Sequence, residues 1–338
     1  MIKYLGSKRT LLSSLVEVVG GLSGARSVID LFSGTSRVGH ALKAQGYRVL
    51  ANDHNAYAHS LASCYVQADR DELLEDVTRL VAELSALPPR SPGWFTQSFC
   101  VEARYFQPKN GERIEAIREA IASKSLPPEL EAVLLVSLME AADRVDSTTG
   151  VQMAYLKQWA PRAHKDLELR VPDLLPRAEA GKGEAHALDA LEAARTLEAD
   201  VAYLDPPYNQ HSYLGNYHVW ETLVRWDAPE AYGVARKRSD VRTRQSPYNR
   251  KREAFAALAE VVRTVRAKHL VVSFSDEGYV PRAAMEDLLR ERGEVTTIAH
   301  DFKRYVGAQI GIHNPSGEKV GTVSHLRNTE YVYVVSNR

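Results

Sequence analysis

The chain of 338 residues is long enough for two or three domains, or for one large α/β domain with an insertion. Its 44% hydrophobic and 25% charged residues are ordinary for a soluble globular protein, and 43 basic against 43 acidic residues give no net charge that would indicate a polyanion partner. No run approaches the roughly 18 apolar residues of a membrane helix, and the N-terminus has no signal-peptide pattern, so we expect a cytoplasmic protein without a membrane partner.

A short basic turn at residues 3–9 precedes the first predicted helix, whose apolar residues recur at helical spacing. Gly6 and Ser7 leave backbone N–H groups free just before this helix, and Lys8 adds a cation, so a carboxylate could bind there. A plain helix start explains the same residues. Taken alone, the segment is better interpreted in that plain way.

The first predicted strand, residues 27–32, runs into a glycine-containing turn and a second helix, which is the shape of a nucleotide-binding unit. The turn does not match the dinucleotide fingerprint Gly-x-Gly-x-x-Gly, because Ser36 holds the middle glycine position. The pattern Asp30-x-Phe32-x-Gly34 therefore favours a nucleoside without a pyrophosphate. It argues against a nicotinamide-dependent dehydrogenase.

The second predicted strand, residues 48–53, ends in Asp53, about 20 residues beyond the first strand. Folds of this kind place at that position a carboxylate that accepts the ribose hydroxyls. The spacing supports nucleoside binding, although an acid at the end of a strand is a weak signal by itself.

The alternation of strands and helices is interrupted from residue 70 to 180. Helices predicted at 112–122 and 129–142, with prolines between and after them, indicate an inserted, mainly helical subdomain. Polar, aromatic and basic stretches at 104–110 and 147–150 could read base edges or grip phosphates. Solvated helix surfaces explain most charges of this kind equally well.

The sheet pattern resumes after residue 180 with a short predicted strand at 184–189. Its terminal Asp189 could approach an adenine ring from the same crevice. We therefore predict an α/β fold with a doubly wound, Rossmann-like sheet. Residues 1–69 and 181–338 would form one domain, with residues 70–180 inserted in it; the family resemblance given below implies that these are a catalytic domain and a target-recognition subdomain.

The strand predicted at residues 201–204 ends in Asp205-Pro206-Pro207-Tyr208, and ligands of open parallel sheets bind at that edge. The Asp205 carboxylate and the Pro206 carbonyl could accept both protons of an exocyclic amine, and Tyr208 offers a flat face to a planar base. Accepting both protons localises the nitrogen lone pair, so the amine could attack an electrophile. Asp-Pro-Pro by itself is also an ordinary strand-to-loop stop.

Residues 236–252 contain eight basic residues and one acid, interleaved with polar and aromatic residues. We interpret this basic stripe as a phosphate-contacting loop beside the Asp205 site, with a flexible solvated loop as the alternative. The predicted DNA contacts are Arg236, Lys237, Arg238, Arg242 and Arg244 in the stripe, and Arg104, Lys109 and Lys157 in the insert.

The chain closes with predicted strands at 269–274 and 295–300, a helix at 283–292 between them, and a final strand at 331–335. A hairpin-like stretch before the final strand contains the turn signal Asn314-Pro315-Ser316-Gly317.

Metal ligation is not indicated by the cysteine and histidine patterns. Cys64 and Cys100 are the only cysteines and stand far apart, so we expect reduced, partly buried thiols rather than a disulfide. The 11 histidines are scattered and form no metal-binding spacing.

The ordered set of motifs resembles the alpha group, or Dam-like class, of S-adenosylmethionine-dependent N6-adenine DNA methyltransferases. The segments that carry the resemblance are, in order, Tyr4-Leu5-Gly6-Ser7-Lys8, Asp30-Leu31-Phe32-Ser33-Gly34-Thr35, Asn52-Asp53 and Asp205-Pro206-Pro207-Tyr208. Residues 104–106, 150–157 and 209–218 are also similar to type II members of restriction-modification systems. The resemblance spans nearly the whole chain.

The resemblance implies S-adenosylmethionine as the cofactor, double-stranded DNA as the substrate and no metal. A cognate restriction endonuclease, as a separate protein, is a partner that the family also allows. The residues that would bind the cofactor are Tyr4, Gly6, Lys8, Asp30, Phe32, Gly34, Thr35, Asp53 and Asp189; those that would hold the target base are Asp205, Pro206, Pro207 and Tyr208. The family usually has glycine at the position of Ser36, so a positive φ there would cost stability and put cofactor affinity in doubt.

Three alternatives to N6-adenine methylation of DNA remain at this point. N4-cytosine methylation uses the same amine chemistry, although N4-cytosine members of the family more often have serine at the position of Asp205. Methylation of RNA on the same scaffold is the second. The third is a DNA-binding protein that keeps the fold without activity, against which the intact Asp205–Tyr208 segment argues.

Overall fold

The computed structural model describes residues 1–6, 8–303, 312–313, 319–321 and 327–336. Ser7 of the N-terminal motif and the predicted turn at 314–317 lie outside the described residues, with most of the hairpin-like stretch around that turn.

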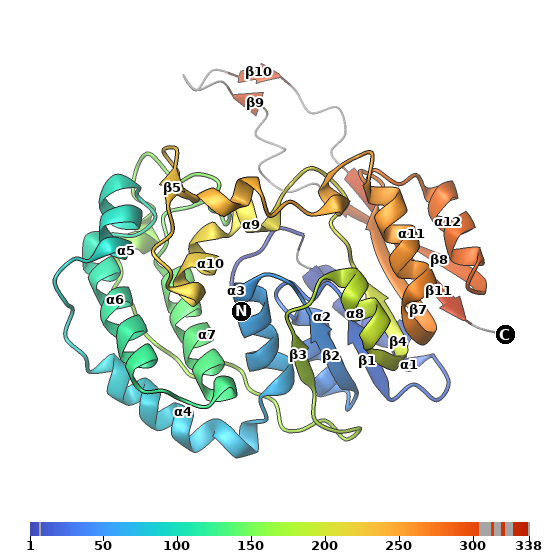
Figure 1. Cartoon of the computed structure of the whole chain (residues 1–338), viewed down its shortest axis with the longest axis horizontal. Coiled ribbons are helices and arrows are strands. Elements are labelled where there is room, and N and C mark those ends of the chain that lie inside the picture. Colours follow the sequence, from blue (N-terminus) through green and yellow to red (C-terminus); the bar gives the residue numbers. More distant parts are fainter. Residues whose placement is uncertain (7, 304–311, 314–318, 322–326, 337–338) are drawn as a thin grey trace.

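A seven-stranded sheet forms the centre of one half of the molecule, in the order β3-β2-β1-β4-β7-β11-β8 (Figure 1). The first five strands are parallel to one another, and β11 is antiparallel to both of its neighbours. The strands are β1 Ser27–Asp30, β2 Arg48–Asn52, β3 Glu184–His186, β4 Glu198–Leu204, β7 Arg266–Ser275, β8 Glu294–Lys303 and β11 Arg327–Ser336. The expected α/β doubly wound fold is confirmed.

Helices cover both faces of this sheet, because its central strands carry apolar residues on both sides. On one face α1 (Leu12–Gly20) and α2 (Arg37–Ala44) pack on Val28, Val201 and Val271. The opposite face is covered by α8 (Ala190–Thr196), α11 (Ala254–Thr264) and α12 (Arg282–Arg290). The two apolar layers leave only the strand ends free to form a site.

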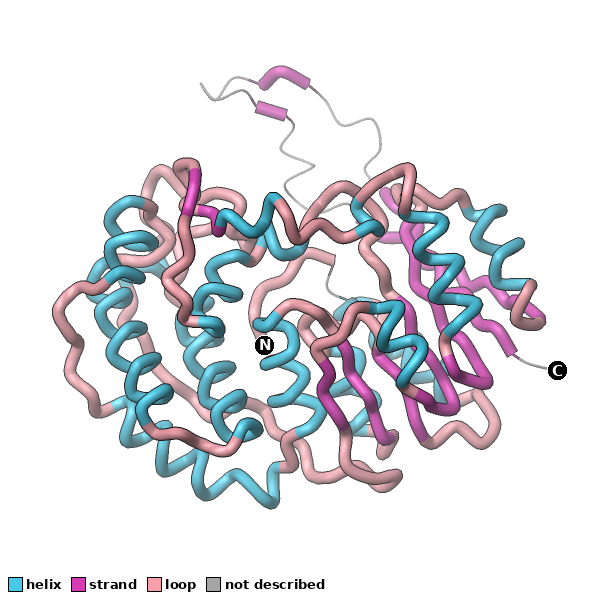
Figure 2. Tube along the Cα trace, viewed as in Figure 1, coloured by secondary structure: helices cyan, strands magenta, loops and turns pink. Residues whose placement is uncertain are grey.

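The second half of the molecule is helical, as Figure 2 shows. Its main helices are α4 (Arg70–Ser85), α6 (Pro108–Ser123) and α7 (Pro128–Arg144). The helices predicted at 112–122 and 129–142 lie inside α6 and α7, which both begin at a proline, a residue suited to the first helical turn. The short α5 (Trp94–Thr96) and a π-helical turn at Gln97–Glu102 pack beside them.

Two helices from outside the insert share its apolar core. They are α3 (Ala56–Ala62), which follows β2, and α10 (His218–Arg225), which follows the Asp205 segment and contributes Trp220. Consequently α10 and the short α9 (Tyr213–Asn216) connect the helical half to the strand end at Asp205.

The predicted basic stripe folds into short regular elements. A hairpin of β5 (Ala231–Tyr232) and β6 (Lys237–Arg238) is followed by 3-10 turns at Ser239–Arg242 and Pro247–Asn249. The remaining elements are β9 Ile312–His313, β10 Lys319–Gly321, 3-10 turns at Lys8–Thr10 and Pro161–His164, and a π-helical turn at Ser63–Gln67.

Cys64 and Cys100 are both buried and free, as predicted. Within the described residues, no helix combines the length and hydrophobicity that a membrane crossing requires.

Candidate active site

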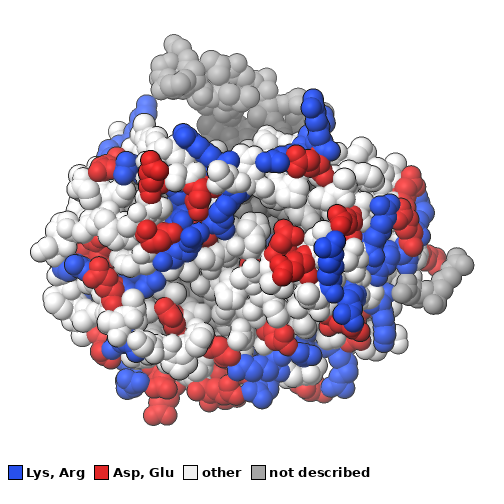
Figure 3. Space-filling model, in the orientation of Figure 1, with Lys and Arg blue, Asp and Glu red and all other residues white. Residues whose placement is uncertain are grey.

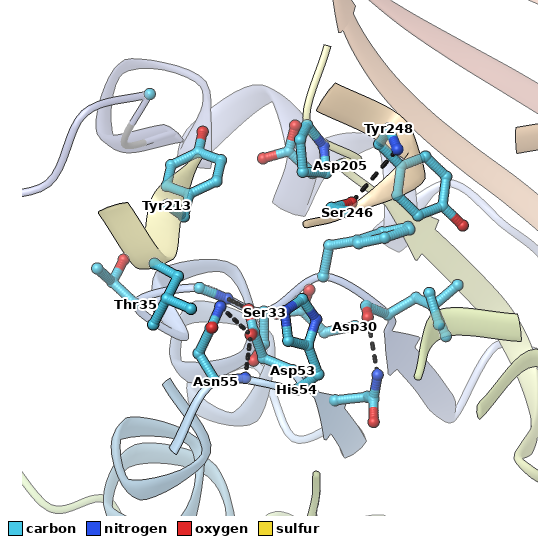
Figure 4. A pocket seen from close by; sticks show the side chains of 18 of the residues that line it. Asp30, Ser33, Thr35, Asp53, His54, Asn55, Asp205, Tyr213, Ser246 and Tyr248 are labelled. Carbon is cyan, nitrogen blue, oxygen red and sulfur yellow. Dashed lines mark hydrogen bonds between the residues drawn. The ribbon is translucent and has the colours of Figure 1, made fainter. Parts of the chain in front are cut away.

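A cavity of about 350 Å³ opens at the carboxyl ends of β1, β2 and β4. Its lining brings together eleven of the predicted cofactor-binding and catalytic residues, from five separated segments: Tyr4, Gly6, Lys8, Asp30, Phe32, Gly34, Thr35, Asp53, Asp189, Asp205 and Pro207. Figure 4 shows Asp30, Asp53 and Asp205 around this cavity, with Tyr213 and Tyr248 on opposite sides. Pro206 and Tyr208 follow Asp205 but are not part of the lining.

One carboxylate oxygen of Asp205 is fixed by contacts with Ser273 and Lys8. Its Oδ1 accepts a hydrogen bond from Ser273 Oγ at 2.9 Å and lies 3.0 Å from the Lys8 ammonium. Among the described residues, none donates a hydrogen bond to Oδ2, so this oxygen can accept a hydrogen bond from a ligand. Burial raises the pKa of Asp205 above its usual range, while Lys8 opposes that rise.

Lys8 lies between two carboxylates rather than at a simple helix start. Its ammonium contacts Asp205 and also Glu330 on β11, and its side chain is only 7% exposed. Burial disfavours the charge, but the two carboxylates outweigh burial and raise the pKa of Lys8. Glu330 was not a predicted site residue, because no motif contains it and it lies just before the predicted strand at 331–335.

Asp53 shapes the glycine turn at the end of β1. Its Oδ2 accepts the backbone N–H of Gly34 at 3.1 Å, and its Oδ1 accepts the N–H and side-chain amide of Asn55 at 3.0 and 3.1 Å. Gly34 has a φ of 50°, and a side chain there would meet the Tyr4 hydroxyl at 3.3 Å. Glycine is therefore required where the backbone approaches the cavity.

Asp30 is a buried carboxylate with one oxygen unused. It is 1% exposed, its Oδ2 accepts the backbone N–H of Gly39 at 3.2 Å, and its Oδ1 has no hydrogen-bond partner. Burial, together with the nearby charge of Asp205, raises the pKa of Asp30 to about 7. Such a group is ready to pair with a cation that enters the cavity.

Ser36 takes the left-handed conformation that its position suggested, with a φ of 57° and a ψ of 23°. It is fully buried, and its hydroxyl has no hydrogen-bond partner. A non-glycine residue in this left-handed conformation lowers the free energy of unfolding by about 1–2 kcal/mol. Replacement by glycine would recover only part of this, because glycine has greater conformational freedom in the unfolded chain.

We therefore expect Ser36→Gly to raise the free energy of unfolding by about 1 kcal/mol, measured by urea denaturation. Ser36→Ala is the matched control, because alanine removes the hydroxyl and keeps the unfavourable φ. An equal gain in both variants would attribute the cost to the buried hydroxyl and would overturn the backbone explanation.

A cluster of tyrosines forms one wall of the cavity. Tyr4 stacks on Tyr213 with ring centroids 5.2 Å apart and on Tyr217 at 4.5 Å, and its hydroxyl lies 3.2 Å from that of Tyr57. Tyr213 and Tyr217 flank the short α9, so the segment after Asp205 closes this side. Both tyrosines lie in the stretch 209–218 that the resemblance included, but neither was a predicted site residue; Tyr213 lines the cavity, and Tyr217 stacks on Tyr4.

The opposite wall comes from the basic stripe. Residues 244–249 line the cavity, and Tyr248 packs edge-on against Phe32 with centroids 5.1 Å apart. Asn249 donates from its amide to the carbonyl of Asn209 at 2.7 Å, which ties this wall to the loop after Asp205. Asp189 caps the start of α8 by accepting the N–H of Leu191 at 2.9 Å, on the same side of the cavity.

A family model described as D12 class N6 adenine-specific DNA methyltransferase matches residues 4–284. The chain belongs to this class. The resemblance found in the sequence is thereby confirmed, and the N4-cytosine alternative is not favoured. The match covers every predicted site residue and ends before Glu330.

Curated relatives agree with this assignment. Type II methyltransferase M.FokI of Planomicrobium okeanokoites is 30% identical over 86% of this chain and 47% of its own length. Modification methylase StsI of Streptococcus sanguinis is 29% identical over 86% of this chain and 46% of its own length. Type II methyltransferase M.NlaIII of Neisseria lactamica is 26% identical over 98% of both chains. This methyltransferase thus spans about half the length of two relatives and nearly all of the third.

Two of the predicted DNA contacts in this methyltransferase are held in internal ion pairs. Arg238 is 2% exposed, and its guanidinium pairs with Asp227 at 2.7 Å and Asp240 at 3.0 Å. Arg244 pairs with the fully buried Glu221 at 2.9 Å and lines the cavity. We predicted both arginines as DNA contacts from the run of basic residues alone. Their acidic partners are Asp227 and Glu221, which lie outside the stripe, and Asp240 within it.

The other predicted contacts lie outside the cavity of the methyltransferase. Arg242 is exposed, with its guanidinium 3.8 Å from the centre of the Tyr232 ring. Figure 3 shows basic and acidic side chains mixed over this face rather than gathered into one positive field. The remaining five are Arg236, which pairs with Glu102, the half-buried Lys237, Arg104 over the Trp159 ring, Lys109, which pairs with Asp166, and the exposed Lys157.

Proposed function

We propose that the cavity binds S-adenosylmethionine and that the enzyme transfers its methyl group to the N6 amino group of an adenine flipped out of double-stranded DNA. The observation that carries this proposal is the Asp205 carboxylate, which lines the cavity and is fixed through Oδ1 by Lys8 and Ser273. Family membership supports the reaction, and the proposal assigns it to these residues.

The cavity residues fit the cofactor proposed for them. Asp30, with its unpartnered buried Oδ1, would pair with the ammonium of the methionine portion. The turn at Gly34, whose φ of 50° favours glycine, would let the backbone approach the cofactor. Asp53 would accept the ribose hydroxyls, and Asp189 with Phe32 and Tyr248 would surround the adenine. When bound, the cofactor supplies a methyl group already activated by a positively charged sulfur.

The target adenine would be held by the Asp205 segment. Oδ2 of Asp205 and the carbonyl of Pro206 would accept the two amine protons and turn the nitrogen lone pair toward the methyl group. Tyr208, whose ring packs edge-on against Phe274 with centroids 6.0 Å apart, would stack on the base. Extruding the base costs a few kcal/mol, which stacking and phosphate contacts would offset.

Alignment supplies much of the rate enhancement in this proposal, because the methyl donor needs no further activation. As the new nitrogen–carbon bond forms, the bond from sulfur to the methyl carbon breaks and its electron pair stays on sulfur. The methylated nitrogen then loses one proton, and Asp205 would accept it. No covalent intermediate with the protein is required.

The surface that would contact DNA includes the exposed cations around the cavity mouth and the helical half. We propose Arg242 and Lys157 as phosphate contacts, with the helical insert reading the target sequence. A separate endonuclease and a cytoplasmic location beside the chromosome are further parts of this proposal.

The proposal is tested by incubating the enzyme with labelled S-adenosylmethionine and unmethylated genomic DNA, followed by digestion to nucleosides and chromatography. We expect the label in N6-methyladenine. Label in N4-methylcytosine would contradict the assignment of the base, and transfer to RNA alone would contradict the assignment of DNA.

Cofactor affinity should depend on pH through Asp30. Because the pKa of Asp30 is raised to about 7, this carboxyl is mostly protonated at about pH 6 and must lose its proton to pair with a cation. Affinity should therefore rise about eightfold from about pH 6 to about pH 7.5 and then level off, as calorimetric titration would measure.

Asp30→Asn should bind more weakly at neutral pH and show no such rise. Asp205→Ala is the matched control: it should keep the rise, with a lower midpoint, because the charge of Asp205 contributes to the raised pKa of Asp30. An affinity of the unmodified enzyme that does not change over this range would contradict the role of Asp30.

A further inference from the structure

Glu330 shares the ammonium of Lys8 with the proposed catalytic carboxylate. Lys8 Nζ lies 3.0 Å from Asp205 Oδ1 and also contacts Glu330 Oε1. The exposed fractions of the three side chains are 7% for Lys8, 20% for Asp205 and 18% for Glu330, so water screens these charges only weakly. Two carboxylates and one ammonium leave this group with one net negative charge when all three are ionised.

The sheet brings these groups to one face by strand alternation. Side chains two residues apart lie on the same side of a strand. Asp205 therefore shares a side with Tyr203, Ser273 with Val271, and Glu330 with Val332. Tyr203, Val271 and Val332 all belong to the apolar layer under α1, and Lys8 immediately precedes that helix. In the antiparallel register, Glu330 stands opposite Ser275 of β7, so the start of β11 lies at the same edge as Asp205.

We propose that Glu330 is a positioning residue for methyl transfer, which holds Lys8 so that Lys8 orients Asp205 without neutralising it. This inference rests on the proposed function of Asp205. With Glu330 in place, the ammonium divides its attraction between two carboxylates. Without Glu330, the full charge of Lys8 would act on Asp205, whose Oδ2 would become a weaker acceptor for the amine protons.

The effect should appear in the pH dependence of the rate. Glu330 raises the pKa of Asp205 and Lys8 lowers it, in addition to the rise that burial causes. Removing the charge of Glu330 should therefore move the acid limb of the kcat profile to lower pH. The groups around this pair that all variants retain are Lys8, Asp30, Tyr203, Tyr208 and Tyr213 near Asp205, and His300 opposite Glu330 on β8.

The decisive comparison is Glu330→Gln against Glu330→Asp. Glutamine keeps the length and the oxygen without the charge, and aspartate keeps the charge on a shorter side chain. We expect Glu330→Gln to lower kcat about 10- to 100-fold, in the range that misplaced catalytic groups produce, and to shift the acid limb downward. Glu330→Asp should keep the acid limb of the unmodified enzyme, with a smaller loss of kcat.

Cofactor affinity, measured separately by calorimetric titration, should change less than about twofold in both variants, because Glu330 does not line the cavity. Glu277→Gln is the matched control, since it removes an exposed carboxylate near the start of β11, where it accepts a hydrogen bond from Asn328. We expect it to leave kcat and the acid limb unchanged.

Two results would overturn the inference. One is an acid limb of the kcat profile that Glu330→Gln does not shift, and the other is a loss of kcat that is equal in Glu330→Gln and Glu277→Gln. Asp205→Ala separates this failure from that of the proposed function. If Asp205→Ala abolishes transfer while Glu330→Gln leaves the profile unchanged, only the inference fails. If Asp205→Ala retains transfer, the proposed function fails as well.

Discussion

Asp205→Ala is expected to lower methyl transfer to DNA by about 1000-fold, because it removes the carboxylate proposed to accept an amine proton of the target base. Cofactor affinity should change only a few-fold, since Asp30, Asp53 and the Gly34 turn remain. The measurements are single-turnover transfer of labelled methyl for the rate and calorimetric titration for the cofactor.

Asp205→Asn separates charge from shape in this experiment. It keeps the side-chain volume and one carbonyl oxygen, so a rate between those of the alanine variant and the unmodified enzyme would show that geometry contributes beside charge. Asp287→Ala serves as a control, because Asp287 is 77% exposed and pairs only with Arg290 among the described residues. Loss of cofactor binding in Asp205→Ala would mean that Asp205 belongs to the cofactor site instead.

Lys8→Met should destabilise the fold by about 3 kcal/mol at neutral pH and abolish transfer, because it leaves Asp205 and Glu330 facing each other without their shared cation. Burial raises the pKa of Asp205 and Lys8 opposes that rise, so without Lys8 the folded-state pKa of Asp205 would lie further above its unfolded value. The ionised Asp205 therefore destabilises the fold above this raised pKa, and the loss should shrink as pH falls through it. Urea denaturation at about pH 5 and about pH 8 measures both effects.

The double variant Lys8→Met with Glu330→Gln tests the cause. Removing one anion together with the cation should recover a large part of the lost stability, so the two changes should be strongly non-additive. A loss that is the same at both pH values, or additive with Glu330→Gln, would show that lost packing and not charge is responsible.

Most of the sheet and part of the site were predictable because they depend on local rules. Apolar runs become buried strands, and parallel strands end at a common edge, so the acids at 30, 53 and 205 had to meet there. The positive φ of Ser36 was predictable as well, since the turn after β1 imposes it whichever residue occupies the position. Two of the three long helices of the insert, α6 and α7, followed from their prolines and their apolar spacing, whereas α4 was not predicted.

The basic stripe shows where such reasoning stops. Eight basic residues within 236–252 predicted a DNA-contacting loop, but Arg238 is buried against Asp227 and Asp240, and Arg244 pairs with the buried Glu221. Residues 244–249 became a wall of the cavity, with Tyr248 against Phe32. Ion pairs of this kind join side chains from different elements, so the sequence shows the charges without showing their partners.

The sequence by itself determined the family, the doubly wound fold class and the carboxylates at the strand ends, because these follow from motif spacing and from the alternation of strands and helices. Only the tertiary structure decided which oxygen of Asp205 is engaged, that Lys8 is shared with Glu330, and that α10 joins the helical half. The physical reason is that each of these depends on contacts between residues far apart in the sequence, 68 positions for Asp205 and Ser273 and 322 for Lys8 and Glu330, or on which face of a helix packs against another element. Such contacts form only when the folded core brings the segments together.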